Sequence, residues 1–238
     1  RAKLKMNKSF QHVASIPDGN RRWAKKKGLP SMIGHEKGSS AFEQILEKSL
    51  ELKIPYLTFW GLSLDNVLKR SKTEISYIYK IIESQFQKMI LDSRIYENKV
   101  KVVVLGRYQE YFPEKTKKII AEIVEKTKNH NHYHLTFLLA YNGTDEMIDC
   151  CQKIKQSKEK NITEKTIKNN LWTKNLPSVD LIIRTGSEDD PHLSAGFMMW
   201  DSAYAQLYFT KTFFPDFKKK EFEKCILDYF ERQRRKGS

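Results

Sequence analysis

Asp18, Arg21 and Arg22 place one carboxylate and two guanidinium groups on a single short segment of the chain. A carboxylate is a ligand for a hard divalent cation, and arginines hold phosphate oxygens through paired hydrogen bonds. Together these groups suit a metal ion bound to a diphosphate. The alternative interpretation is that Asp18 only caps a surface helix whose outer face is basic.

The residues around Asp18 predict a strand, a turn and a helix, in that order. Residues 12–16 are mostly apolar and indicate a short buried strand, and residues 17–20 are types that favour tight turns. A helix that begins at about Asn20 directs its free backbone N–H groups at the turn, where they attract an anion. These are the elements that a phosphate-binding turn requires.

Four more apolar runs indicate strands, and segments with helical periodicity separate them. The runs are 56–63, 100–106, 134–142 and 179–186. Such a pattern predicts a mostly parallel sheet flanked by helices, in one α/β domain over residues 1–238. We expect the tails, about 1–10 and 233–238, to be flexible.

Polar residues follow several of these expected strands. Ser63 and Asn66 follow the second, Asn142 follows a later one, and Arg184 ends the last. Ligands of a parallel sheet gather at the carboxyl ends of its strands, so we expect these residues to converge with Asp18. The result would be a cationic, metal-binding mouth above an apolar interior.

An apolar stripe marks one long helix, expected from about Lys72 to Asn98. It comprises Ile75, Ile78, Ile82, Phe86, Met89 and Ile90. The stripe either lines a channel or is ordinary core packing, and packing is expected for most of its members. Ser40 and Glu43 have the spacing of a capping box and suggest that another helix begins near them.

The chain is strongly basic, with 43 Lys and Arg against 29 Asp and Glu, a net charge of +14. A positive field attracts nucleic acids, anionic lipid or phosphorylated small molecules. No zinc spacing or RNA-binding signature accompanies the charge, so we expect no nucleic-acid partner. Three cysteines without a disulfide pattern favour a reducing, cytoplasmic location. The positive charge is also compatible with peripheral contact with an anionic membrane.

Five blocks of sequence together resemble the cis-prenyltransferases, the undecaprenyl diphosphate synthase family. They are Asp18-Gly-Asn-x-Arg22-Trp-Ala, Gly34-His35, Ser63-x-x-Asn66, Asp180-Leu-Ile-Ile-Arg184-Thr-Gly186 and Trp200-x-Ser-Ala-Tyr204 continuing to Phe217. They occur in the family's order from about residue 12 to residue 217. The resemblance implies a single α/β domain, an apolar tunnel, a homodimer and Mg²⁺. It also implies condensation of isopentenyl diphosphate with an allylic diphosphate to form a new cis double bond.

The resemblance also implies roles for individual residues. Asp18 would hold Mg²⁺ against the allylic diphosphate, and His35 would lie near the departing diphosphate. Ser63 and Asn66 would stand beside the reacting carbons, where a proton is lost. The remaining residues would bind the two diphosphates or cover the mouth: Gly19, Asn20, Arg21, Arg22, Trp23, Ser31, Arg70, Glu74, Arg184, His192 and Ser194.

Several positions depart from the family's pattern. Gln206 stands where the family has a glutamate that helps to hold the metal, and a neutral amide is a weaker ligand for Mg²⁺. Ser31 and His192 stand at or near positions of diphosphate-binding arginines. The acidic run Glu188–Asp190 is either a compensating metal site or, as we rather expect, a solvated loop.

These departures leave two alternatives to chain elongation. The first is a relative that couples prenyl groups head to middle or cyclises a diphosphate. The second is a non-catalytic partner subunit of a two-component prenyltransferase, although such partners lose the Asp18–Trp23 block that this chain keeps.

Overall fold

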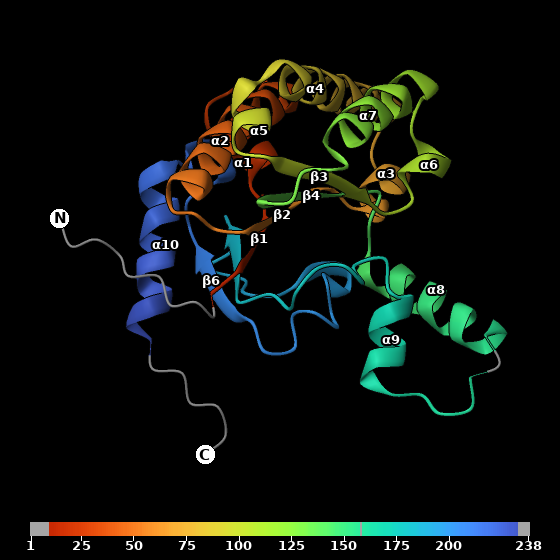
Figure 1. The fold of residues 1–238 in the computed structure, drawn as a ribbon. Helices are drawn as coiled ribbons and strands as arrows, with labels where there is room; N and C mark the ends of the chain where they lie inside the picture. Colours follow the sequence, from red (N-terminus) through yellow and green to blue (C-terminus); the bar gives the residue numbers. More distant parts are fainter. Residues whose placement is uncertain (1–9, 158, 233–238) are drawn as a thin grey trace.

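Six parallel strands form one sheet in the computed structural model, which describes residues 10–157 and 159–232. The spatial order is β3-β4-β2-β1-β5-β6 (Figure 1). The strands are β1 (His12–Ile16), β2 (Tyr56–Leu62), β3 (Val100–Leu105), β4 (Tyr133–Leu139), β5 (Leu181–Thr185) and β6 (Gln206–Thr210). The single α/β domain with a parallel sheet is therefore confirmed.

Helices connect most of these strands. They are α1 (Asn20–Lys26), α2 (Ser31–Glu51), α3 (Leu64–Lys69), α4 (Lys72–Leu91), α5 (Ser93–Glu97), α6 (Tyr108–Tyr111), α7 (Glu114–Thr127), α8 (Gly143–Gln156), α9 (Glu164–Asn170) and α10 (Lys219–Glu231). Two short 3₁₀ turns, η1 (Ser194–Gly196) and η2 (Phe214–Asp216), lie near the end of the chain. The expected helix start at Asn20 is confirmed.

The two faces of the sheet are covered differently. Side chains alternate along each strand, so Val13 of β1 joins the core under α2, α4, α7 and α10, whereas Ala14 joins a smaller core on the opposite face. Figure 1 shows α2, α4, α5 and α7 together on one side of the sheet. On the other side the smaller core is completed by residues of the irregular segments around Leu176 and Phe197.

A third, small cluster of buried residues belongs to α8 and α9. It consists of Cys150, Ile154 and Leu171, and Figure 1 shows these two helices set apart from the layers of the sheet. Glu146 at the base of α8 is 3% exposed and accepts hydrogen bonds from the Tyr141 hydroxyl at 2.5 Å and from the Thr173 backbone at 2.8 Å. Glu146 thereby attaches this pair of helices to the body of the protein.

Three local expectations were wrong. The expected helix from Lys72 to Asn98 is two helices, because Asp92 leaves the helical conformation and caps α5 by accepting the Arg94 N–H. Ser40 lies within α2, which begins nine residues earlier at Ser31 after Pro30, so it is no cap. The short edge strand β6 was missed.

The two ends of the described part of the chain pack against each other. Phe10, expected in a flexible tail, is 3% exposed and packs on Tyr229 of α10 with ring centroids 4.5 Å apart. The rest of the expected tails, 1–9 and 233–238, lies outside the described residues.

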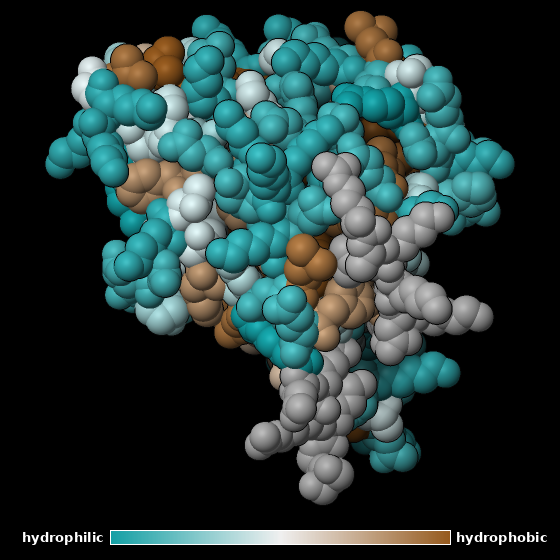
Figure 2. Space-filling view, turned by 90° about the vertical axis from the view of Figure 1, so that its left-hand side faces the viewer, coloured by the Kyte–Doolittle hydropathy of each residue, from teal (hydrophilic) through white to brown (hydrophobic). Residues whose placement is uncertain are grey.

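The side of the molecule carrying α10 is mainly hydrophilic (Figure 2). No helix in the described ranges has the length and apolar content needed to cross a membrane.

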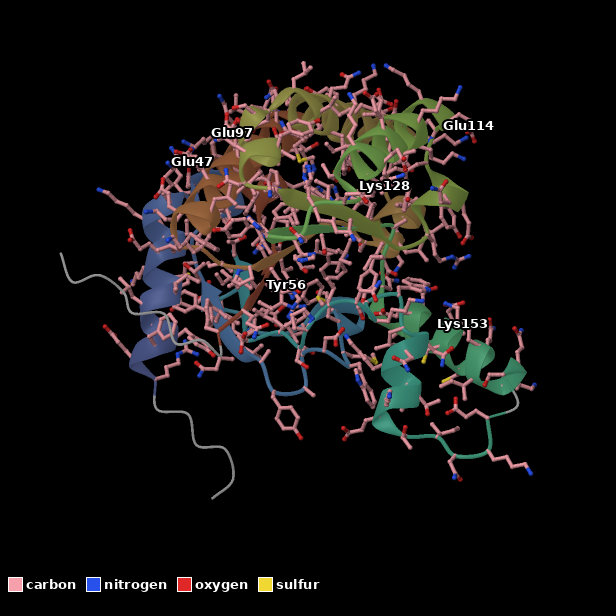
Figure 3. All side chains as sticks on the ribbon, in the orientation of Figure 1. Glu47, Tyr56, Glu97, Glu114, Lys128 and Lys153 are labelled. Atoms are coloured by element: carbon pink, nitrogen blue, oxygen red, sulfur yellow. The ribbon has the colours of Figure 1, made fainter. Side chains whose placement is uncertain are left out.

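Many basic side chains are paired on helix surfaces. Glu47 on α2, labelled in Figure 3, contacts Arg94 of α5 at 3.7 Å and also Lys219 of α10. Lys153 pairs with Asp149 one turn earlier on α8 at 2.6 Å. Water screens exposed pairs of this kind, so they add little to the stability of the fold.

His12 is a fully buried histidine in the first strand. Its Nδ1 lies 2.8 Å from the Pro177 carbonyl oxygen, which can only accept, so Nδ1 donates and Nε2 accepts from the Thr58 hydroxyl at 2.8 Å. Burial lowers the pKa of His12 from 6.5 to about 4. The folded protein therefore holds this imidazole neutral at a pH where the unfolded chain protonates it.

This difference predicts that stability falls as the pH falls from about 6.5 to about 4. The unfolded state binds the extra proton in that window, and the loss from His12 alone is about 3 kcal/mol at its lower end. Urea unfolding across this range should show a weaker pH dependence for His12→Gln, whose amide makes both hydrogen bonds without titrating. Equal pH dependence in the two proteins would contradict the prediction.

Candidate active site

The strand register brings the carboxyl ends of β1, β2 and β5 to one edge of the sheet. Ile16 of β1 pairs with Arg184 of β5, and Ser15 pairs with Phe59 of β2. The winding of the chain reverses at β1, since β2 lies on one side of it and β5 on the other. This position favours ligand binding in parallel sheets, and Asp18 stands directly above it.

Thr185 fixes the backbone of the turn after β1. The Asp18 N–H donates to the Thr185 hydroxyl at 2.9 Å, and that hydroxyl donates back to the Asp18 carbonyl oxygen at 2.7 Å. Gly19 then adopts φ of +100°, and a Cβ there would lie 2.5 Å from Cδ1 of Phe213. The turn therefore requires glycine both for its backbone angle and for space.

Two arginines and one backbone N–H contact the Asp18 carboxylate. Its Oδ1 accepts from the Gly19 N–H at 2.5 Å and lies 2.9 Å from Nη2 of Arg22. Its Oδ2 accepts from Nη2 of Arg184 at 2.9 Å. The carboxylate is thus already surrounded by donors, and the cationic groups around it are in place to meet a further anion.

Arg184 is 7% exposed and joins the two halves of the site. Besides Asp18, it donates to the His192 carbonyl oxygen at 2.6 Å and to Oγ of Ser194 at 3.0 Å. The His192 ring contacts Ser194 Oγ at 3.1 Å. The structure therefore brings together Asp18, Arg22, Arg184, His192 and Ser194.

Two glycines of α2 set the position of α1. A Cβ on Gly34 would lie 2.1 Å from the Asn20 carbonyl oxygen, and one on Gly38 would lie 2.5 Å from Oδ1 of Asn20. The helices approach this closely because both glycines lack side chains. The first turn of α1, which carries Arg21 and Arg22, is held against α2 by this contact.

A second charged cluster lies where α2, α3 and α4 meet. Glu74 accepts from Nη1 of Arg70 at 2.9 Å, lies 3.3 Å from Nε2 of His35 and lies 3.8 Å from Nε of Arg21. Burial and, secondarily, the neighbouring Arg70 guanidinium lower the pKa of His35. Four residues of the sequence prediction are therefore grouped here, with a neutral imidazole among them.

Ser63 and Asn66 occupy the loop and helix after β2. Ser63 caps α3, since its Oγ accepts the Asn66 N–H at 3.1 Å, and both residues line a cavity below the turn. Asn142 reaches the same edge of the sheet. Its amide donates to Oδ1 of Asp65 at 2.8 Å, and Asp65 lines that cavity although Asn142 itself does not.

That cavity has a volume of about 520 Å³, and its wall combines polar groups around Asp18 with an apolar part. Side chains from α2, α4, β2, β4 and η2 form its aromatic part: Phe42, Phe59, Phe86, Phe137 and Phe214. The stripe on α4 serves both expected purposes. Ile78, Ile82 and Phe86 line the cavity, whereas Ile75 and Met89 belong only to the core.

A second pocket of about 560 Å³ adjoins the first and is lined mainly by polar groups. Pro17, Asp18, Asn20, His35 and Arg70 line both spaces. The polar pocket also contains Arg21, Arg22, Lys25, Leu29 and Ser31. An elongated ligand with an anionic head and an apolar tail fits this pair of spaces.

Buried polar atoms without a protein partner also indicate a ligand. Among the described residues these include Oδ1 of Asn20, Nε of Arg70 and Nε of Arg184. Buried donors and acceptors are normally satisfied, so groups of this kind at a cavity are explained by a bound molecule or water. The two arginine nitrogens suit an anion.

The donor set at Asp18 also bears on the implied Mg²⁺. No three His, Cys, Asp or Glu side chains within residues 10–157 and 159–232 gather closely enough to hold a metal ion alone. Magnesium commonly takes one or two carboxylates and completes its shell with water and substrate phosphates. The donor set is therefore compatible with an ion that is bound jointly with a diphosphate, and Asp18 is the carboxylate that would hold it.

Gln206 is not placed to share that metal within one chain. It pairs with Leu181 at the start of β5, three residues before Arg184, so the sheet separates it from the site edge by about 10 Å or more. Trp23 lines neither of the two pockets; it is 8% exposed and its ring packs under Lys27. Both residues were expected at the site, and the position of Gln206 depends on the long-range pairing of β6 with β5.

The acidic run after β5 has the geometry of a solvated loop. Glu188, Asp189 and Asp190 are all exposed, and the nearest ion pair joins Asp190 to His192 at 3.3 Å. Ser31, expected among the diphosphate-binding residues, is the first residue of α2 and lines the polar pocket with its hydroxyl.

Thr185, Phe213 and Gly38 are contributors that sequence reasoning missed. Thr185 lies within the block used for the resemblance, immediately after Arg184, and a hydroxyl there could have been noticed. Phe213 and Gly38 act through contacts between segments far apart in the chain, which one sequence does not reveal.

Comparisons with known proteins agree with this geometry. Residues 16–237 match the family described as "Putative undecaprenyl diphosphate synthase". A tritrans,polycis-undecaprenyl-diphosphate synthase (geranylgeranyl-diphosphate specific) of Thermoplasma volcanium is 36% identical over 95% of this chain and 88% of its own length. An isoprenyl transferase of Thermotoga maritima is 38% identical over 95% of this chain and 96% of its own.

Two solved structures resemble the fold over nearly its whole length. Lavandulyl diphosphate synthase from Lavandula x intermedia, in complex with dimethylallyl diphosphate, has a TM-score of 0.89 and 27% identity, and the match covers 96% of this chain and 98% of that one. A probable undecaprenyl diphosphate synthase from Campylobacter jejuni has a TM-score of 0.78 and 25% identity, covering 98% and 100%. The chain belongs to the undecaprenyl diphosphate synthase family of prenyltransferases.

Proposed function

We propose that this protein condenses isopentenyl diphosphate with an allylic diphosphate and so makes a cis-polyprenyl diphosphate. The observation that carries the proposal is the junction at Asp18, where a cationic pocket opens into an apolar cavity. The names of the Thermoplasma and Thermotoga relatives support the same chemistry.

The polar pocket would bind the allylic diphosphate. Arg22, Arg70 and the free N–H groups at the start of α1 would hold its oxygens, and His35 would lie beside it as a neutral hydrogen-bonding group. Mg²⁺, when bound by Asp18 and phosphate oxygens, would neutralise the charge that develops on the departing diphosphate. The arginines supply the same stabilisation from the protein itself.

The second substrate would lie on the β5 side of the turn. Arg184, Ser194 and the His192 ring would bind its diphosphate, since these three groups already contact one another. Ser63 and Asn66 would stand beside the reacting carbons, where the new bond forms and a proton leaves the second substrate. The phenylalanine-rich wall would exclude water from the allylic carbon and accept the growing tail.

Product analysis tests this function directly. Purified protein is incubated with Mg²⁺, a series of allylic diphosphates and labelled isopentenyl diphosphate, and the products are identified by mass. We expect labelled products that grow by whole isoprene units. Product formed without isopentenyl diphosphate would contradict elongation and would indicate cyclisation or head-to-middle coupling instead. A folded protein that makes no product alone would instead fit a partner subunit.

Head-to-middle coupling is the second candidate function. The fold has a TM-score of 0.89 with lavandulyl diphosphate synthase and of 0.78 with the probable undecaprenyl diphosphate synthase. This greater structural similarity is the observation that supports testing head-to-middle coupling. A branched product from dimethylallyl diphosphate alone, recognised by its proton NMR spectrum, would establish this reaction.

We further propose that two copies of the chain associate through α8. Ile148 on this helix is 59% exposed, and two apolar grooves of about 330 and 320 Å³ share Met147 and Cys151 beside it. An exposed apolar patch of this kind is typical of an interface. We expect light scattering to give the mass of a dimer.

The variant Ile148→Glu should convert the dimer to a monomer, because it buries a charge in the proposed interface. Leu91→Glu is the matched control, since Leu91 is 84% exposed at the far end of α4 and should leave the dimer intact. A wild-type monomer, or a dimer that survives Ile148→Glu, would contradict this assignment.

A cytoplasmic location with peripheral membrane contact completes the proposal. The three cysteines Cys150, Cys151 and Cys225 are all free thiols, as a reducing compartment favours. The net charge of +14 would attract an anionic bilayer, which is where long prenyl products are delivered. Sedimentation with vesicles containing anionic lipid, compared with neutral vesicles, measures this contact.

A further inference from the structure

The geometry points to Phe213 as a positioning residue for Arg22, an inference that rests on the function proposed above. The guanidinium carbon of Arg22 lies 5.3 Å from the centroid of the Phe213 ring. Nη2 of the same group lies 2.9 Å from Oδ1 of Asp18. The guanidinium is therefore fixed between a carboxylate and a ring face, although its side chain is 53% exposed.

Phe213 is itself held rigidly against the two turns of the site. The Gly186 N–H donates to the Thr212 carbonyl oxygen at 2.9 Å, and the Phe214 N–H donates to the Asp18 carbonyl oxygen at 3.0 Å. These two backbone hydrogen bonds lie on either side of Phe213. The strand β5 and the turn after β1 thus both determine where its ring stands.

The ring also fills the space that two glycines leave open. Its Cδ1 lies 2.5 Å from the place of a Cβ on Gly19 and 3.0 Å from that on Gly186, and both glycines have positive φ. The phenyl edge therefore packs against the turn itself, while its face is presented to Arg22. The Phe213 side chain therefore contacts both the turn and the Arg22 guanidinium, so the shape of the turn helps to determine where that guanidinium lies.

This arrangement prepares Arg22 for a diphosphate. An exposed arginine samples many rotamers, and ordering it upon binding opposes binding. A ring beneath the guanidinium plane orders the group in advance through a cation–π contact and does not cover the N–H groups at its edge, of which Nη2 also pairs with Asp18. Phe213 then raises affinity for the allylic diphosphate without touching it.

The first test measures binding of inorganic diphosphate with Mg²⁺ to the full chain by titration calorimetry. Phe213→Leu keeps an apolar contact with the glycines but removes the ring face. We expect its dissociation constant to rise about 5- to 30-fold, the equivalent of about 1–2 kcal/mol. Phe213→Tyr keeps the face and should bind within about twofold of wild type.

A double-mutant cycle then shows whether the ring acts through Arg22. In an Arg22→Gln background, Phe213→Leu should cause no further loss, because the group that it positions is gone. Losses that add in the double variant would overturn the proposal, as would wild-type affinity in Phe213→Leu. Phe213→Met, which refills the same space, is measured alongside and should weaken binding equally, with thermal unfolding recorded for every variant.

Steady-state kinetics distinguish a positioning role of Phe213 from a general loss of structure in the variant. The KM for the allylic diphosphate should rise about 5- to 30-fold in Phe213→Leu while kcat changes less than about twofold, since the contact exists before the reaction begins. A fall in kcat at unchanged KM would overturn the role. Wild-type protein that binds diphosphate but makes no prenyl product would overturn the proposed function alone, and failure to bind diphosphate would overturn both.

Discussion

Replacing Asp18 with Asn should lower prenyl transfer by at least about 100-fold, because it removes the negative charge that two arginines contact and that would hold the proposed Mg²⁺. The amide keeps the size of the side chain and can still accept the Gly19 N–H. The backbone of the turn is held independently by Thr185, so the fold should persist. Steady-state turnover and thermal unfolding measure the two effects separately.

Asp189→Asn makes the same chemical change at an exposed acid just after β5. Its turnover should match that of wild type, because the loop containing Asp189 is solvated. If Asp18→Asn retained more than about a tenth of wild-type turnover, Asp18 would not have the electrostatic role assigned to it. A large loss in Asp189→Asn would revive the acidic loop as a metal site.

Replacing Gly34 with Ala should impair both stability and activity, against the usual trend for helices. Alanine within a helix is ordinarily favoured over glycine by about 1 kcal/mol. Here the added methyl group would lie 2.1 Å from the Asn20 carbonyl oxygen, so α1 must move away from α2. We expect a net loss of about 2 kcal/mol, in the range of other overpacked contacts, and at least tenfold lower turnover.

Ser40→Ala in the same helix is the matched control, since Ser40 is exposed and its replacement also improves helix propensity. Chemical denaturation should show equal or slightly greater stability for this control. A Gly34→Ala protein as stable and active as Ser40→Ala would show that the contact between α1 and α2 can relax freely.

Several site residues that sequence reasoning located lie at or just beyond the carboxyl end of a strand. Asp18 lies in the turn after β1, Ser63 caps the helix after β2, and Arg184 lies near the end of β5. The apolar runs identify these strands, and parallel pairing brings their ends to one edge. Each strand and the residues at its end are recognised from neighbouring residues alone, and only the pairing of the strands is a long-range property. For this reason the sequence was enough to locate these residues.

The errors arose where long-range contacts decide. The resemblance placed Gln206 at the metal site with Asp18. In the structure the register of β6 pairs Gln206 with Leu181, and no sequence pattern within β6 predicts that register. The apolar periodicity predicted one helix across Asp92. The structure has two helices there, because the Asp92 side chain caps α5.

The separate core of α8 and α9 has a consequence for the motions of the protein. Cys150, Ile154 and Leu171 bury little surface compared with the sheet, and α8 and α9 contact mainly each other. Such a unit can open cooperatively without unfolding the rest. Amide hydrogens of α8 and α9 should therefore exchange with solvent sooner than those of β1, and pairing of two copies through α8 would slow that exchange far from the diphosphate pocket.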